Sequence, residues 1–182
     1  MDDAIAFMTD LDARFQRASG LSDRRFYSIF YSRLCRSAVM VIGIKPGGRT
    51  DGSHQLASQT FYEDWSHEYV DMNYPIAAVM RPALMTALEI SDFAQLRRVP
   101  KTNTFFHRAV GTDDFTREEY VAHVRMCAPF VDEMISFVDP KAIVLEGLAA
   151  RENLVTQLCR SVHTIESECP PSAPMRQNVG ID

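Results

Sequence analysis

The sequence lacks any long hydrophobic run. None of its stretches approaches the roughly 18 consecutive apolar residues that a membrane-spanning helix needs. Its first residues read MDDAIAFMTDLDARF and are acidic and amphipathic, whereas a secretory signal is basic and then apolar. We therefore expect a soluble, cytoplasmic protein with no membrane partner. At 182 residues, of which 46% are hydrophobic, the chain has the size of one compact domain.

Closely spaced cysteines are also lacking. The four cysteines form no C-x-x-C pair, so their spacing suggests neither a zinc site nor a redox dithiol. They are Cys35, Cys127, Cys159 and Cys169. No nucleotide-binding fingerprint is present either, because the glycine turn GIKPGG lacks the required spacing. We expect free thiols, no bound metal and no cofactor.

Positive charge is in deficit over the whole chain. The 24 acidic residues outnumber the 19 lysines and arginines, which gives a net charge of -5. Proteins that coat nucleic acid normally present a positive surface, so this balance argues against that class. Positive charge is nevertheless gathered locally, since the stretch 97–108 holds four basic residues and no acid, and Lys45 and Arg49 precede Asp51.

Apolar spacing predicts helices that alternate with short buried strands. Helices are expected at about 3–18 with Gly20 at the end, and at 22–35, 75–94, 116–138 and 148–160. Strands are expected at 39–43, 102–107, 142–145 and 162–165. Thr116 and Glu119 fit a capping box. The long irregular stretch 48–74 carries an aromatic cluster and is typical of a functional or mobile loop.

This alternation predicts an α/β domain with a mainly parallel sheet. In such sheets, ligands bind outside the carboxyl ends of the strands. Three segments follow predicted strands or lie at their ends: GIKPGG, TNTFFHR and ECPPSAPMR. One edge of the sheet could therefore gather all three.

The order of these segments resembles the uracil-DNA glycosylase superfamily, and most of all its iron-sulphur bacterial and archaeal branch. The turn G-x-x-P-G is matched by 43–47, and the strand motif T-N by Thr102 and Asn103. A helix with a cysteine, a proline and an aromatic residue is matched by 127–130, followed by a P-K-hydrophobic strand and a glycine at 140–147. The last motif, H-P-S-A-x-x-R, is matched by 170–176, which read PPSAPMR.

The resemblance covers about 39–176 and implies a fold. It implies a three-layer α/β/α domain with a central, mainly parallel four-stranded sheet. The whole chain, 1–182, would be one such domain, with N-terminal helices over 1–36 and the motif-bearing core over 37–176. It also implies DNA containing uracil or another damaged base as the partner.

The resemblance further assigns roles to single residues. Asn103 matches the residue whose amide reads the extruded base, since an amide both donates and accepts. Phe61 is a candidate for the stacking aromatic, although packing against the sheet is an equal alternative. The base-binding set is Gly43, Ile44, Lys45, Phe61 and Asn103. The DNA-binding set is Lys45, Gly47, Ser172 and Arg176, through charge, hydroxyl and backbone contacts to phosphate.

The chain departs from the family at its chemical positions. Related turns carry an Asn, Asp or Glu where this chain has Ile44 and Lys45, and the last motif has Pro170 in place of a histidine that donates to the departing base. Lys45 could contact phosphate or, if desolvated, act as a nucleophile on the sugar. Only Cys127 matches a cluster ligand, so we predict no iron-sulphur cluster.

Other side chains could replace the missing groups. Asp51, Glu63 and Asp64 lie in the long loop and are the candidate catalytic acids, with solvated surface residues as the alternative. The candidate hydrogen-bond donors are His54, His67 and His107, with structural histidines as the alternative.

Two functions remain open from the sequence. The first is a DNA-base glycosylase with relocated catalytic groups, which predicts that a carboxylate from Asp51, Glu63 or Asp64 faces Asn103 across a pocket. The second is a catalytically inactive relative that binds nucleic acid, a free base or a protein partner.

Overall fold

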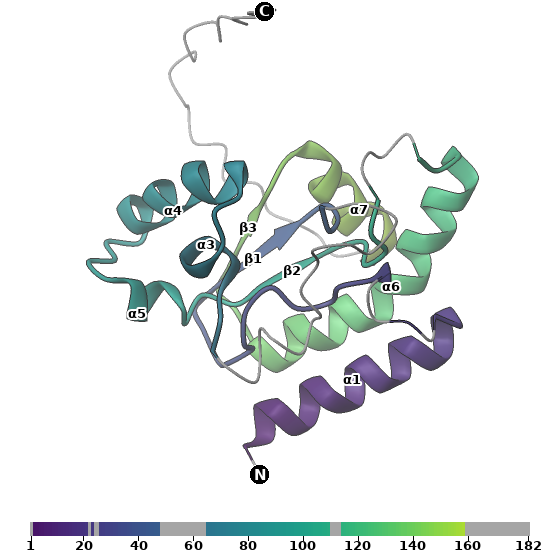
Figure 1. Ribbon diagram of the computed structural model, residues 1–182, viewed down its shortest axis with the longest axis horizontal. Coiled ribbons are helices and arrows are strands. Elements are labelled where there is room, and N and C mark those ends of the chain that lie inside the picture. The colour runs from purple at the N-terminus through teal and green to yellow at the C-terminus, as the bar shows by residue number, and fades with distance from the viewer. Residues whose placement is uncertain (1, 22, 24–25, 48–64, 110–113, 159–182) are drawn as a thin grey trace, which may run out of the picture.

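The computed structural model describes residues 2–21, 23, 26–47, 65–109 and 114–158, and it has a mixed α/β fold (Figure 1). The strands are β1 (Val39–Gly43), β2 (Lys101–Asn103) and β3 (Ala142–Leu145). The helices are α1 (Asp3–Ser19), α3 (Glu68–Asp71), α4 (Pro75–Ala87), α5 (Phe93–Leu96), α6 (Arg117–Val138) and α7 (Leu148–Leu158).

The described strands form a small, open, parallel sheet in the order β2-β1-β3. Gly43 on β1 is level with Asn103 on β2, and Ile42 is level with Leu145 on β3. The three predicted strands within the described residues are therefore confirmed, although β2 ends at Asn103, well before the predicted end at residue 107. The predicted fourth strand, 162–165, lies outside the described residues.

The central strand β1 is buried on both faces, as its unbroken apolar run predicts. Met40 and Ile42 belong to a large core cluster with side chains of α1 and α6, whereas Val41 belongs to a second cluster with side chains of α3, α4 and α5. Figure 1 shows α1 and α6 side by side, with α3, α4 and α5 grouped on another side of the sheet. The edge strand β3 differs from the prediction, because its side chains are only half-buried and Ala142 is exposed.

The N-terminal helix matches its prediction, but the predicted helix at 22–35 is wrong. Helix α1 ends at Gly20, whose φ of +69° is a left-handed conformation that glycine adopts without strain. The described residues beyond it are mostly extended and form antiparallel bridges from Tyr27 to His107 and from Phe30 to Thr102. Backbone pairing with a distant part of the chain replaces the local hydrogen bonds of a helix there, so tertiary contacts outweigh local propensity.

The later helices follow the start and stop signals of the sequence. The capping box of Thr116 and Glu119 is present, and α6 ends at Asp139, directly before a proline. The predicted helix 75–94 is shorter, because α4 ends at Ala87 and a separate short helix, α5, follows. Pro82 lies inside α4 without ending it. Among the helices of the described ranges, none is both long and apolar enough to cross a bilayer.

Candidate functional site

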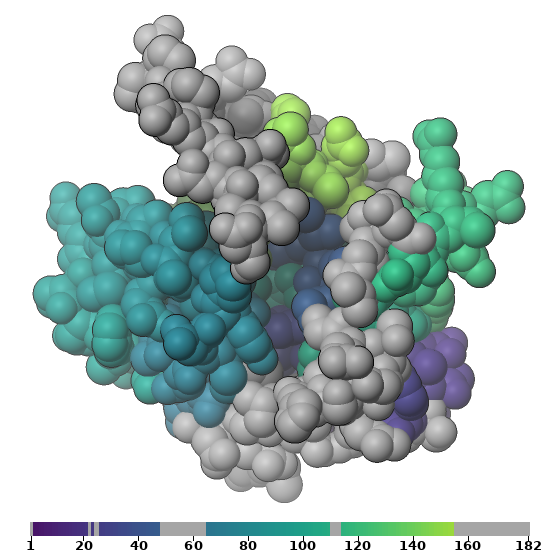
Figure 2. All heavy atoms as spheres, turned by 45° about the horizontal axis from the view of Figure 1, so that its top comes forward, coloured from purple at the N-terminus to yellow at the C-terminus, as the bar shows by residue number. Residues whose placement is uncertain are grey.

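Three strands bring one residue each to the same point at the carboxyl edge of the sheet. Gly43 ends β1, its register partner Asn103 ends β2, and Glu146 directly follows β3. The Glu146 amide donates to the Ile42 carbonyl at 3.0 Å, which holds Glu146 against the end of β1. In Figure 2 the dark blue atoms around the end of β1 lie in a hollow between the teal helices α3 to α5 and the green atoms of α6.

Gly43 has no side chain and so leaves space for the side chains of Asn103 and Glu146. A Cβ atom added at Gly43 would stand less than 3.0 Å from both Asn103 Oδ1 and Glu146 Oε2, a separation that real Cβ atoms essentially never show. The amide of β2 and the carboxylate after β3 therefore converge over the central strand. No larger residue at Gly43 allows this arrangement without displacing one of them.

Asn103 presents a buried amide at this point. As a residue Asn103 is 2% exposed, and within the described residues no hydrogen bond of its side-chain amide is found. Asn103 is thus available to bind a ligand that offers both donors and acceptors.

Glu146 belongs to a buried ionic cluster, which we define as Glu68, Tyr69, Lys101 and Glu146. Lys101 Nζ lies 2.6 Å from Glu68 Oε2 and 2.9 Å from Glu146 Oε2. The Tyr69 hydroxyl donates to Glu146 Oε1. The side chain of Lys101 is 3% exposed and that of Glu146 is 11% exposed, so both charges are held largely away from water.

The protonation of the cluster follows from these contacts. Burial alone would lower the pKa of Lys101, but the carboxylates of Glu68 and Glu146 raise it above its ordinary value. Burial, and then the neighbouring Glu146, raises the pKa of Tyr69, so its hydroxyl keeps its proton and donates it. With both carboxylates ionised, the cluster carries two negative charges against the single positive charge of Lys101.

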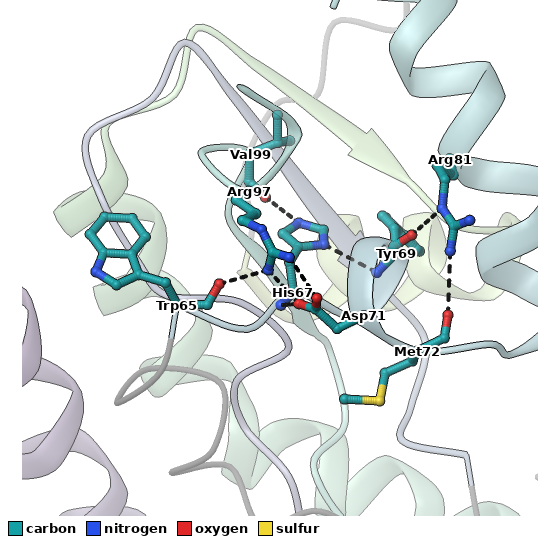
Figure 3. A network of polar contacts seen from close by, with 8 residues as sticks. All are labelled: Trp65, His67, Tyr69, Asp71, Met72, Arg81, Arg97 and Val99. Carbon is teal, nitrogen blue, oxygen red and sulfur yellow. Dashed lines mark hydrogen bonds and ion pairs between the residues drawn. The ribbon is translucent and has the colours of Figure 1, made fainter. Parts of the chain in front are cut away.

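The short helix α3 supplies two members of the cluster and is fixed by a backbone-directed network (Figure 3). His67 precedes it, and its Nδ1 accepts from the Tyr69 amide at 3.1 Å, so Nε2 carries the proton and donates to the Val99 carbonyl at 2.9 Å. Arg97 pairs with Asp71 at the other end of α3, through Nη2 and Oδ1 at 2.6 Å. These contacts set the positions of Glu68 and Tyr69, and both ring nitrogens of His67 are used by the backbone.

His67 makes the stability of this region depend on pH. Burial lowers its pKa to about 4, against an ordinary value of 6.5, so folding favours the neutral ring. Its contribution to stability is complete above pH 6.5 and is lost as the pH falls toward 4, by about 3 kcal/mol at most. Urea unfolding of the wild type at pH 7 and pH 4.5 should reveal this loss. His67→Gln should show a shallower pH dependence, and an unchanged dependence would contradict this assignment.

The glycine turn after β1 holds Lys45 against the backbone. Lys45 Nζ donates to the Ala109 carbonyl at 2.6 Å, and burial lowers the pKa of its amine. The Ile44 carbonyl accepts from the Thr104 hydroxyl at 3.0 Å, which ties the turn to the chain after β2. Gly47 accepts from Arg108 through its carbonyl at 3.3 Å. The turn is therefore fastened beside Asn103, with Lys45 bound internally.

Most of the other predicted site residues lie outside the described residues. They are the candidate acids Asp51, Glu63 and Asp64, the stacking candidate Phe61, the candidate phosphate contacts Ser172 and Arg176, and the candidate donor His54. His107 is described, and its ring packs against His123 with the ring centroids 4.0 Å apart. Burial lowers the pKa of His107 to about 4. It is a neutral packing residue at physiological pH.

The described thiols are not arranged for metal binding. Cys35 and Cys127 are free, as the spacing predicts, and burial raises the pKa of Cys127 to about 12. Within the described ranges, no three His, Cys, Asp or Glu side chains are gathered closely enough to hold a metal ion.

The sequence interpretation missed Lys101 and Glu146. Glu146 could have been found, because it is the first residue after a buried strand, where parallel sheets place their ligand-binding groups. Lys101 gave no such signal, since a lysine before a strand is normally a surface residue. Its burial depends on the register that places it beside β1, with Glu68 and Glu146 within reach.

Two comparisons of the sequence with known proteins found no relative. No protein-family model matches the chain, and no curated protein matches it significantly in sequence. The chemistry of the edge is therefore inferred from its own residues: the amide of a buried asparagine and a carboxylate with an 11% exposed side chain, which meet over a glycine.

Proposed function

We propose that the protein is a DNA-base glycosylase, which hydrolyses the bond between the sugar and a damaged base at the edge formed by Gly43, Asn103 and Glu146. The observation that carries the proposal is the convergence of the Asn103 amide and the Glu146 carboxylate over Gly43. The resemblance of the motifs at 43–47 and 102–103 to uracil-DNA glycosylases supports it. We also propose that the domain has three α/β/α layers and a four-stranded sheet, as the resemblance implies.

Each group at this edge suits one need of the reaction. An extruded base has to be read along its polar edge, and the unpartnered amide of Asn103 can donate to it and accept from it. The sugar becomes cationic as the bond breaks, and a carboxylate can stabilise that charge and take a proton from the attacking water. Glu146 is the carboxylate at this position, in place of the acid that the glycine turn lacks.

Lys101 and Tyr69 act as positioning residues in this scheme. Each oxygen of Glu146 already accepts from one of them, which fixes the carboxylate in a single orientation. A carboxylate oxygen can accept more than one hydrogen bond, so each retains capacity for water or for a ligand. Holding a catalytic group rigidly avoids reorganisation during the reaction.

DNA contacts outside the edge remain part of the proposal. We propose that Gly43, Ile44 and Lys45 flank the base and that Gly47, Ser172 and Arg176 contact phosphate, with Phe61 stacking on the base. Asp51, Glu63 and Asp64 are proposed as alternative carboxylates. Bound to the Ala109 carbonyl, Lys45 has to exchange that bond before it can contact DNA.

An inactive relative that binds nucleic acid, a free base or a protein partner is the second candidate. It is favoured by the fact that both oxygens of Glu146 are already engaged and that Lys45 is bound internally. In this case Asn103 would bind a base without any cleavage of the glycosidic bond.

A single-turnover assay tests the proposal. Oligonucleotides carrying uracil, hypoxanthine, xanthine or 7-methylguanine, single- and double-stranded, would be incubated with excess protein, and abasic sites would be detected by alkaline cleavage. We expect Asn103→Ala to lower the cleavage rate by about 100-fold.

Asn153→Ala is the matched control. This residue is a half-buried asparagine whose amide donates to Thr104 and Tyr120, so its loss tests general damage to the fold. The control should cleave at the wild-type rate. Equal rates for Asn103→Ala and the wild type, or no cleavage of any substrate, would contradict the glycosylase proposal.

A further inference from the structure

The buried ionic cluster at the edge carries an excess of negative charge. Lys101 is in contact with both Glu68 and Glu146, so two carboxylates share one ammonium group. Tyr69 contributes a neutral donor and no positive charge. Among the described cations, only Lys101 is in salt-bridge contact with these two carboxylates. A ligand at Asn103 would therefore lie beside a carboxylate that shares its cation with a second carboxylate.

We propose that this site takes a positively charged base, of which an N-alkylated purine is the representative chemical class. The inference rests on the proposed function and narrows its substrate. Charge interactions are strong in a buried site, because little water is present to screen them. A cationic base would supply the missing positive charge, whereas a neutral base would leave the excess in place.

The negative charge of the two carboxylates also affects neutral and cationic bases differently as they leave the sugar. When a neutral base such as uracil departs, the electron pair of the glycosidic bond leaves it as an anion, which the carboxylate pair would repel. When a cationic purine departs, the same electron pair neutralises the ring, so a neutral base is released. The reaction then needs no positively charged partner for the base, which agrees with an edge where the cation in contact with Glu146, Lys101, is already shared by two carboxylates.

The step balances with water as the only co-reactant. The water oxygen bonds to C1′ of the sugar as the bond from C1′ to the base nitrogen breaks, and the electron pair of that bond moves into the cationic ring. One proton of the water passes to the Glu146 carboxylate and then to solvent. The products are a neutral N-alkylated base and an abasic sugar.

Asn103 also fits the polar edge of such a base. A purine of the guanine type presents a ring N–H between an amino group and a carbonyl. The Asn103 amide can accept from the ring N–H and donate to the carbonyl, which leaves Glu146 for the attacking water. Gly43 leaves room for these contacts because it has no side chain between them.

Binding of two matched oligonucleotides tests the inference. One carries 7-methylguanine, which is cationic, and the other carries 7-deaza-7-methylguanine, which has nearly the same shape and no charge. Fluorescence anisotropy with the full chain should show at least about tenfold tighter binding of the cationic probe. In Glu146→Gln this ratio should fall close to one, while Glu118→Gln, which removes the same charge from an exposed position on α6, should keep the wild-type ratio.

Thermal unfolding shows whether the Glu146→Gln variant is folded. As a second control, the Glu146→Asp variant keeps the negative charge and should therefore still bind the cationic probe more tightly than the neutral one. Equal affinity of the wild type for the two probes, or a ratio that survives in Glu146→Gln, would overturn the inference. Asn103-dependent cleavage of uracil together with equal affinities would leave the glycosylase proposal standing and reject the cationic substrate. A strong preference for the cation without cleavage of any probe would support the charge-selective site and reject the glycosylase.

Discussion

Replacing Gly43 with alanine is expected to abolish base binding at the edge and to lower the free energy of unfolding by about 1–3 kcal/mol. The added Cβ would stand less than 3.0 Å from both Asn103 Oδ1 and Glu146 Oε2. Asn103 is 2% exposed and Glu146 is held by Lys101 and Tyr69, so making room for the added methyl group has a cost. The effect is measured by urea unfolding and by anisotropy with the 7-methylguanine oligonucleotide.

Gly47→Ala is the matched control for stability. An added Cβ at Gly47 would meet nothing within 4 Å, and the free energy of unfolding should therefore remain close to that of the wild type. If Gly43→Ala were as stable as Gly47→Ala and bound the oligonucleotide with wild-type affinity, the convergence of Asn103 and Glu146 over the central strand would be refuted.

Replacing Lys101 with methionine is expected to lower the free energy of unfolding by about 3–5 kcal/mol. The substitution keeps the buried aliphatic stem but leaves Glu68 and Glu146 without their shared cation. Lys141→Met is the control, because Lys141 is exposed beside the start of β3 and its charge is in contact with water. The control should unfold close to the wild-type urea midpoint.

The pH dependence of Lys101→Met gives a sharper test of the same contact. Without the cation, two negative charges are held largely away from water with no neutralising partner, which costs more as the pH rises. The stability of the variant is therefore expected to fall as the pH rises. In the wild type the pKa of Lys101 is itself raised, so its contribution is complete below about pH 10.4 and is lost only at higher pH.

Urea unfolding at pH 5 and pH 8 separates these behaviours. The difference in stability between wild type and Lys101→Met should be larger at pH 8 than at pH 5. A difference that is independent of pH would show that the loss comes from packing alone, and that Lys101 does not neutralise a buried carboxylate.

Short patterns in the sequence correctly predicted the structural features that depend on residues close together in the chain. The capping box at Thr116, the glycine after α1 and the apolar run of β1 each depend on neighbours in the chain, and each is present in the structure. The meeting of Gly43 and Asn103 followed from the rule that parallel strands place their carboxyl ends together.

Features that depend on distant parts of the chain were not predicted. A helix was expected at 22–35, but the Ser28 amide donates to the Phe106 carbonyl at 2.8 Å and the Tyr31 amide to the Lys101 carbonyl at 3.1 Å. The ionic cluster depends on the register of three strands and on the position of α3, none of which has a local signal. Its charged residues were therefore given no role in the interpretation of the sequence.

The most direct test of the central claim is the rate of abasic-site formation by wild type and Glu146→Gln, measured in parallel under single-turnover conditions on the 7-methylguanine oligonucleotide. We expect cleavage by the wild type and a rate at least about 100-fold lower in the variant, because the amide of glutamine cannot accept the proton of the attacking water. Equal rates in the two proteins, with both folded, would show that the carboxylate facing Asn103 takes no part in the chemistry.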